Sequence, residues 1–167
     1  LDRCYSVSRI PMANGKEFVL YNLHLSAYTS DGTIATEQLE MLCADMLREY
    51  ESGNYCIAGG DFNKDLLGAS AEIFGVTGGE NDTWAQPIPE GTIPAGLSLV
   101  APFDPEHPVA SCRTANEPYD VTTSFRVTVD GFLVSDNVTV LGADVVDADY
   151  RYSDHNPIYM DFILRSE

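Results

Sequence analysis

Positive charge is scarce in this chain. Its 167 residues include 9 Lys and Arg against 26 Asp and Glu, which gives a formal net charge of −17 at pH 7. A field of that sign repels polyanions unless a metal ion or a local basic patch intervenes. The composition therefore disfavours generic binding to duplex nucleic acid, although solubility alone accounts for an acidic chain equally well.

Long apolar runs are also missing. No stretch of about 18 apolar residues occurs, so we expect no membrane-spanning helix, and no leader-like segment opens the chain. The length corresponds to a single domain, residues 1–167. The chain begins at Leu1, and Cys4–Met12 already has the composition of a strand. We expect from this that it is a fragment of a longer protein, of unknown localisation.

The four cysteines do not form a metal-binding pattern. Cys4, Cys43, Cys56 and Cys112 show no C-x-x-C spacing, which disfavours a zinc site. The first and third lie in apolar strand-like runs, and Cys43 lies on the apolar stripe of a helix. This placement predicts buried free thiols, while the even count leaves disulfides open.

The first third of the chain alternates between strands and a helix. Strand-like runs at Cys4–Met12 and Phe18–Leu25 flank an Asn-Gly turn, which predicts a hairpin. Apolar residues at three- and four-residue steps predict a helix over Thr33–Glu51. A short buried strand is expected at Tyr55–Ala58. The strand–helix–strand order favours a layered α/β architecture.

The middle of the chain is irregular and its end is strand-rich. Lys64–Ser111 is rich in proline, and within it Leu66–Phe74 favours a short helix. A loop this long in a compact domain is usually functional or mobile. Strands are expected at Phe125–Ser135, Val138–Val146 and Ile158–Leu164, joined as an antiparallel meander.

Polar residues stand where two of the early strands end. His24 closes an apolar strand, and Asp61 and Asn63 follow the glycines after Tyr55–Ala58. On extended backbone, residues i and i+2 face the same way, so Asp61 and Asn63 are expected to point into one cleft. Glycine lets the backbone approach a ligand closely. The alternatives are a buried histidine bonded to backbone and an Asp/Asn turn that caps the chain.

Two further polar segments lie near the end of the chain. An aspartate inside an apolar strand is costly unless paired, so Asp130 is expected to pair with His155 or to face water at a strand edge. Asp154 and His155 lie side by side before the strand Ile158–Leu164. Adjacent residues within a strand point to opposite faces, so two neighbours that reach one substrate belong on the loop before it.

Four segments of this kind occur in order: Asn22–Leu25, Gly59–Asn63, Asp130–Ser135 and Ser153–Pro157. Over residues 3–164 this pattern resembles the endonuclease/exonuclease/phosphatase (DNase I-like) superfamily. The resemblance implies an α/β (α+β) fold, part of a four-layer DNase I-like sandwich with a mainly antiparallel sheet and flanking helices. It also implies that residues 1–167 form the C-terminal part of the domain and that the N-terminal half is absent.

The resemblance also implies roles for particular residues. The residues that it makes catalytic are His24, Asp61, Asn63, Asp130 and His155. Asp61 would orient or deprotonate water, and Asp130 would hold His155, which acts on the phosphate. Asp154 and Asn63 would bind a divalent metal, Mg²⁺ or alternatively Mn²⁺. The phosphate contacts would be His24, Asn63 and Arg3, with Arg9 as an alternative to Arg3.

The activity implied by the resemblance is metal-dependent phosphoester hydrolysis by the full-length parent, as a phosphodiesterase, nuclease or phosphatase. Its substrate would be nucleic acid, a phospholipid headgroup or a nucleotide, and Trp84, Phe103, His107 and Arg113 are candidates for shaping that choice. The superfamily's main metal glutamate lies in the missing half, so the fragment is expected to be impaired. An exposed sheet face would favour a homodimer.

Two other classes of function remain open. One is a degenerate, non-catalytic half-domain used for binding or assembly. The other is a secreted adhesion-type sandwich, which would need a disulfide framework.

Overall fold

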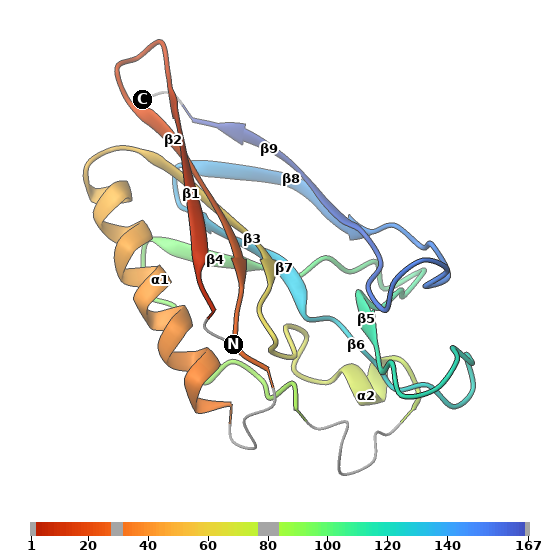
Figure 1. Ribbon diagram of the computed structural model, residues 1–167. Coiled ribbons are helices and arrows are strands. Elements are labelled where there is room, and N and C mark those ends of the chain that lie inside the picture. The colour runs from red at the N-terminus through yellow and green to blue at the C-terminus, as the bar shows by residue number, and fades with distance from the viewer. Residues whose placement is uncertain (1–2, 28–31, 77–83, 166–167) are drawn as a thin grey trace.

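The computed structural model describes residues 3–27, 32–76 and 84–165 (Figure 1). Its main sheet has the strand order β1-β2-β3-β7-β4. The strands are β1 (Tyr5–Pro11), β2 (Glu17–His24), β3 (Tyr55–Asp61), β7 (Asp130–Ser135) and β4 (Leu97–Val100). β2 and β3 run parallel, and the other neighbours run antiparallel. The predicted α/β class with a mainly antiparallel sheet is confirmed.

One long helix, α1 (Thr33–Glu51), covers one face of this sheet (Figure 1). Its bounds are those predicted from the spacing of its apolar residues. Val19, Tyr21 and Leu23 alternate along β2 with exposed residues and pack against the helix, with exposures of 0%, 1% and 4%. Leu39 of α1 is also fully buried in this cluster. This face of the sheet is therefore covered by a buried hydrophobic core.

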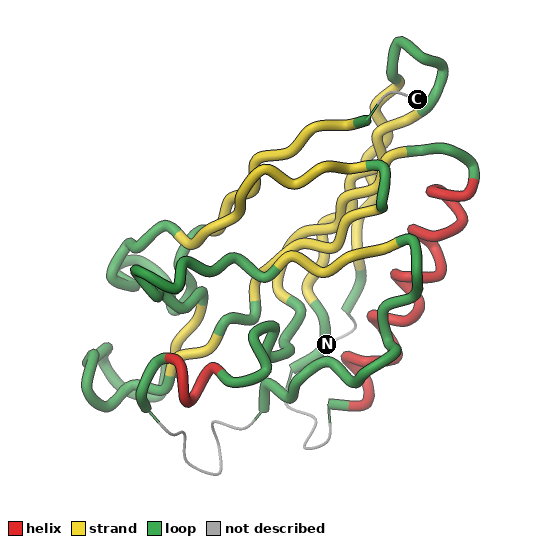
Figure 2. The backbone as a smooth tube through the Cα atoms, turned by 180° about the vertical axis from the view of Figure 1, so that it is seen from behind, coloured by secondary structure: helices red, strands yellow, loops and turns green. Residues whose placement is uncertain are grey.

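A separate antiparallel hairpin lies on the other face, formed by β8 (Val138–Val145) and β9 (Ile158–Leu164). Figure 2 shows it and α1 on opposite sides of the main sheet. Phe18 of β2 meets Phe162 of β9 at a ring-centroid distance of 5.8 Å. The antiparallel pairing of the last two predicted strands is confirmed. The meander as a whole is wrong, because β7 pairs with β3 and β4 and not with β8.

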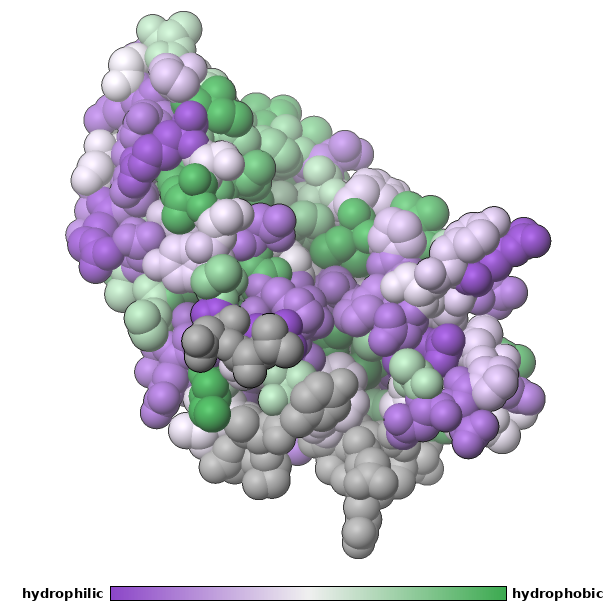
Figure 3. Space-filling view, in the orientation of Figure 1, coloured by the Kyte–Doolittle hydropathy of each residue, from purple (hydrophilic) through white to green (hydrophobic). Residues whose placement is uncertain are grey.

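The hairpin covers this second face incompletely. Ile10 is 47% exposed and Leu20 is 39% exposed, although both lie on strands of the main sheet. Figure 3 shows apolar side chains gathered on the surface where the first hairpin and β9 lie. The second face thus keeps apolar surface in contact with water.

The region predicted to be irregular, Lys64–Ser111, holds two short elements, α2 (Ser70–Ile73) and β4. Directly after it, β5 (Cys112–Arg113) pairs with β6 (Arg126–Val127). The single strand expected at Phe125–Ser135 is divided into β6 and β7. Between them, the carbonyls of Thr128 and Val129 accept hydrogen bonds from Leu66 N–H and Phe62 N–H, both 2.9 Å.

All four cysteines are free thiols. Cys43, Cys56 and Cys112 are buried as predicted, but Cys4 is exposed, so the prediction is wrong for that residue. None of the helices in the described parts of the chain is long and apolar enough to cross a membrane.

Candidate active site

Three of the predicted site residues meet at one edge of the main sheet. His24 ends β2, Asp61 ends β3 and Asp130 begins β7. In the strand register, His24 is paired with Asp61 and Asp61 with Asp130. Because β2 and β3 run parallel and β7 runs antiparallel to them, segments far apart in sequence reach the same edge.

The glycine pair before Asp61 serves strand packing. Gly60 has φ +142°, and a Cβ there would lie 2.1 Å from the carbonyl oxygen of Leu23. At Gly59, a Cβ would lie 3.0 Å from Phe132 Cδ1. The close approach that these glycines allow is therefore to β2 and β7, and the approach of a ligand to them stays a prediction.

Asp61 and Asn63 form a turn and are not extended. Asn63 has φ +49°, and its backbone N–H donates to Asp61 Oδ1 at 2.8 Å. Its side-chain Nδ2 donates to the carbonyl of Leu25, also at 2.8 Å. The expected i, i+2 geometry is therefore replaced by an Asx turn. Within the described parts of the chain, Asn63 Oδ1 accepts no hydrogen bond.

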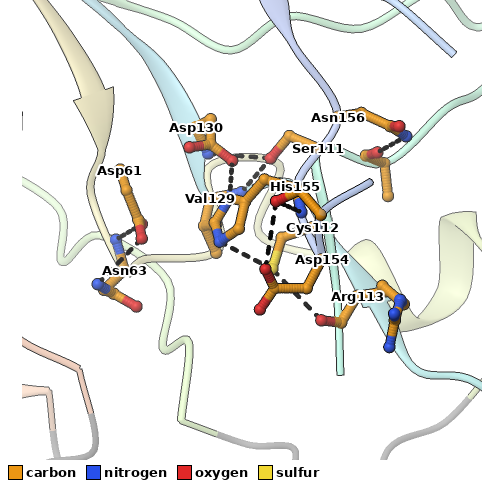
Figure 4. A network of polar contacts seen from close by, with 12 residues as sticks. Asp61, Asn63, Ser111, Cys112, Arg113, Val129, Asp130, Asp154, His155 and Asn156 are labelled. Atoms are coloured by element: carbon orange, nitrogen blue, oxygen red, sulfur yellow. Dashed lines mark hydrogen bonds and ion pairs between the residues drawn. The ribbon is translucent and has the colours of Figure 1, made fainter. Parts of the chain in front are cut away.

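Asp130 and His155 form a close pair. The Nδ1 atom of His155 lies 2.7 Å from Asp130 Oδ2, and both side chains are mostly buried (Figure 4). This bond, and then the contact with Cys112, hold the pKa of His155 well above its ordinary value, against the opposing effect of burial. We therefore describe the imidazole as a cation at neutral pH, with Nδ1–H donating to Asp130.

A second acid–imidazole contact lies beside the first. His24 Nε2 is 3.3 Å from Asp61 Oδ2. Burial, followed by the charge on Asp130, raises the pKa of Asp61 to about 6. Burial, followed by the positive charges of Arg3 and His155, lowers the pKa of His24. At neutral pH the site thus pairs an ionised Asp61 with a neutral His24.

The loop that carries Asp154 and His155 is held by β5. Cys112 forms an isolated antiparallel bridge with His155, and Arg113 N–H donates to the carbonyl of Asp154 at 3.0 Å. The Cys112 sulfur lies 3.5 Å from His155 Nε2 (Figure 4). The sequence did not identify Cys112 as a site residue, because its cysteines were assessed only for zinc, disulfides and burial.

These side chains line a cavity of about 340 Å³. Of the predicted site residues, the ones that line it are Arg3, His24, Asp61, Asn63, Asp154 and His155. Asp130 reaches the site through His155. Arg9 lies elsewhere, 2.7 Å from Glu17 and paired with Glu49 of α1, so the structure does not support it as the basic contact.

The four rim candidates separate into two pairs. Trp84 and Arg113 line the cavity. Phe103 lines a different hollow, against the β8–β9 hairpin, and His107 is exposed beside Asp104. Only the first two therefore lie where a substrate in the cavity would meet them.

The oxygen and nitrogen donors of the site are compatible with a divalent metal. In the described ranges, one acid–imidazole group, Asp61, Asp130 and His155, brings its donor atoms within 4.8 Å of one another. Asp154 is outside that group, but Asp154 and Asn63 both line the same cavity. Hard oxygens of this kind suit Mg²⁺ that keeps several waters. The assignment of Asp154 and Asn63 as metal ligands stays a prediction.

No protein-family model and no curated protein matches the sequence. Solved structures do match the fold. A zebrafish (D. rerio) TDP2 complexed with single-strand DNA product has a TM-score of 0.62 and 20% identity, covering 96% of this chain and 62% of that one. An endonuclease/exonuclease/phosphatase family protein from Bacteroides thetaiotaomicron has a TM-score of 0.59 and 16% identity, and the match covers 98% of this chain and 56% of that one.

The fold of this chain is also similar to that of a mannosyl-6-phosphatase from Bacteroides thetaiotaomicron. Its TM-score is 0.57 at 18% identity, and the match covers 96% of this chain and 57% of that one. The chain therefore spans less than two thirds of the length of these proteins. Across that span, it has the DNase I-like fold of the endonuclease/exonuclease/phosphatase superfamily.

Proposed function

We propose that the full-length protein is a metal-dependent phosphoester hydrolase and that the cavity beside Asp61 and His155 is its active site. The observation that supports this most strongly is the register of His24, Asp61 and Asp130 at one sheet edge, with His155 2.7 Å from Asp130. Proteins of the same fold include a mannosyl-6-phosphatase and a TDP2 complexed with single-strand DNA product, and this similarity also supports the proposal.

The charges of the site suit this reaction. His155, held as a cation by Asp130, places positive charge beside the cavity and offsets the negative charge that grows on the phosphate. Asp61, ionised above pH about 6, accepts a proton from the attacking water. His24 and Arg3 line the same cavity and orient the phosphate. A divalent cation at Asp154 and Asn63 would supply further neutralising charge.

We also propose that residues 1–167 are the C-terminal part of a larger domain and that this part alone is a weak catalyst. The exposed apolar residues on the second sheet face support this, because a complete sandwich would cover them. The matched structures are longer than this chain, which is consistent with the same view. The predicted homodimer has no support from the single-chain structure and stays a prediction.

The substrate is left to experiment among nucleic acid, phospholipid headgroups and nucleotides. The net charge of −17 weighs against a polynucleotide, but the remainder of the full-length protein also contributes surface. A non-catalytic half-domain is the other candidate. It does not explain why His24, Asp61 and His155 face one cavity.

The test is a substrate panel on the full-length protein, with Mg²⁺ and with chelator. The panel contains p-nitrophenyl phosphate, its bis-ester, a sugar phosphate, a nucleotide, a phosphoinositide and single-stranded DNA. We expect chelator-sensitive hydrolysis of at least one ester, lost in His155→Gln and kept in His107→Gln, whose histidine is exposed and outside the cavity. Equal activity of the two variants, or none in the wild type on any ester, would contradict the proposal.

A further inference from the structure

Cys112 is a buried thiol in the cavity that the proposed mechanism does not use. The residue is 3% exposed, and its sulfur lies 3.5 Å from His155 Nε2. His155 Nδ1 is bonded to Asp130 at 2.7 Å. Both nitrogens of the imidazole therefore have a protein partner, one on each side of the ring (Figure 4).

The backbone fixes the contact between Cys112 and His155. The two residues form an antiparallel bridge, although 43 positions separate them. On one side of the bridge, Asn156 N–H donates to the Ser111 carbonyl at 2.8 Å. On the other, Arg113 N–H donates to the Asp154 carbonyl at 3.0 Å. These main-chain bonds hold the backbones of the two residues side by side, and the thiol, which also lies 3.5 Å from the carbonyl oxygen of Arg113, meets the ring from there.

The same segment also holds the other member of the pair. Ser111 is fully buried, and its hydroxyl oxygen accepts the backbone N–H groups of Val129 and Asp130, both at 3.0 Å. Ser111 therefore fixes the backbone at the start of β7, where the Asp130 side chain departs. Ser111 thus contacts the backbone of Asp130, and the next residue, Cys112, contacts the Nε2 atom of His155.

We propose that Cys112 is a positioning residue for His155. Its thiol holds Nε2 in place from the side opposite Asp130, so that the ring is oriented for phosphate before substrate arrives. The contact stands on the geometry alone, whereas its effect on turnover rests on the proposed function. The competing view is that the thiol only fills space, as Cys43 of α1 does in the core between the helix and the main sheet.

Kinetics of matched variants separate these views. In the full-length protein, we expect Cys112→Ala to lower kcat by about 10–100-fold, as loss of an orienting partner does, with little change in KM. Cys112→Ser keeps a hydroxyl that bonds to the ring and should recover most of that loss. The control is Cys43→Ala, equally buried but on α1, which should leave kcat unchanged. Wild-type kcat in Cys112→Ala, or no recovery in Cys112→Ser, would overturn the proposal.

A spectroscopic measurement tests the contact without turnover. The chain has three histidines, so side-chain ¹⁵N signals are assignable with single His→Gln variants. We expect Cys112→Ala to shift the Nε2 signal of His155 and not that of His107. Unchanged His155 signals would overturn the proposal. A shifted His155 signal in a protein that hydrolyses no ester would contradict the proposed function and still support the positioning contact.

Discussion

The two faces of the main sheet differ in how completely this chain covers them. On the α1 face, Val19 and Leu39 are fully buried. On the other face, the β8–β9 hairpin leaves Ile10 at 47% and Leu20 at 39% exposure. Val19 and Leu20 are neighbours on β2, so the contrast comes from what lies over each face and not from the strand itself.

The residues that stabilise the chain and the residues proposed to carry out its chemistry lie in different parts of the sheet. The α1 face buries a cluster of apolar side chains, and this burial stabilises the sheet. The cavity, by contrast, lies at the end of the sheet and depends on the loop before β9 and on β5. We therefore expect substitutions in the core to act on folding and substitutions at the sheet end to act on the reaction.

The largest expected effect is on the helix-covered face. Leu39→Ala should lower the free energy of unfolding by about 2–5 kcal/mol, since it removes a fully buried side chain and leaves a cavity. Leu20→Ala in the isolated chain should cost less than about 1 kcal/mol, because that side chain is already partly in water. Urea unfolding measures both. Equal costs would show that the two faces do not differ.

The next prediction compares the effects on kcat of substituting an aspartate at each end of β7. Asp130→Asn should lower kcat of the full-length protein by about 100-fold, because His155 loses the carboxylate that keeps it cationic. The control is Asp136→Asn, just beyond the other end of β7 and exposed to solvent. Steady-state kinetics on a hydrolysed ester would measure both, and similar losses would remove the contrast between the ends.

The pH dependence of the reaction tests whether the sheet end that carries Asp61 does the chemistry. Asp61 is an acid whose pKa is raised to about 6, so its basic form is lost as the pH falls through that value. Below pH 6, kcat/KM should fall about tenfold per pH unit. The measurement is kcat/KM of the full-length protein from pH 4.5 to 8. A flat profile between pH 5 and 7 would show that Asp61 is not the base.

The smallest effect concerns the open face in the longer protein. If the remainder of the domain covers Leu20, then Leu20→Ala should cost about 1–2 kcal/mol more in the full-length protein than in residues 1–167. Leu39→Ala, on the face already closed, should cost the same in both. Paired urea titrations check this. An equal cost for Leu20→Ala in both forms would mean that no further segment covers the open face.

Regular patterns in the sequence were sufficient to predict part of this fold. The helix Thr33–Glu51 was predicted because its apolar residues recur at helical spacing from Leu39 to Tyr50. The hairpin around the Asn-Gly turn and β9 were predicted for similar local reasons. β4 and β5 were missed because they are short and lie among prolines, and the pairing that creates them is non-local.

The candidate site shows the same limit. His24, Asp61, Asp130, Asp154 and His155 were identified because each stands next to a strand in a recurring order. For Asp61 and Asn63 the sequence left two geometries open, a shared extended face and an Asp/Asn turn. The structure has the turn, with Asn63 at φ +49° and its N–H bonded to the Asp61 side chain. The role of Cys112 was not predictable, because only the folded chain brings it to His155.

Phosphate binding tests the central claim most directly, that the sheet-end cavity is a phosphoester site. Inorganic phosphate with Mg²⁺ is titrated into ¹⁵N-labelled residues 1–167, and the side-chain signals of the three histidines are followed. The predicted result is that His24 and His155, which line the cavity, shift together while His107 does not. Shifts at His107 alone, or no shift at His24 and His155, would contradict the account.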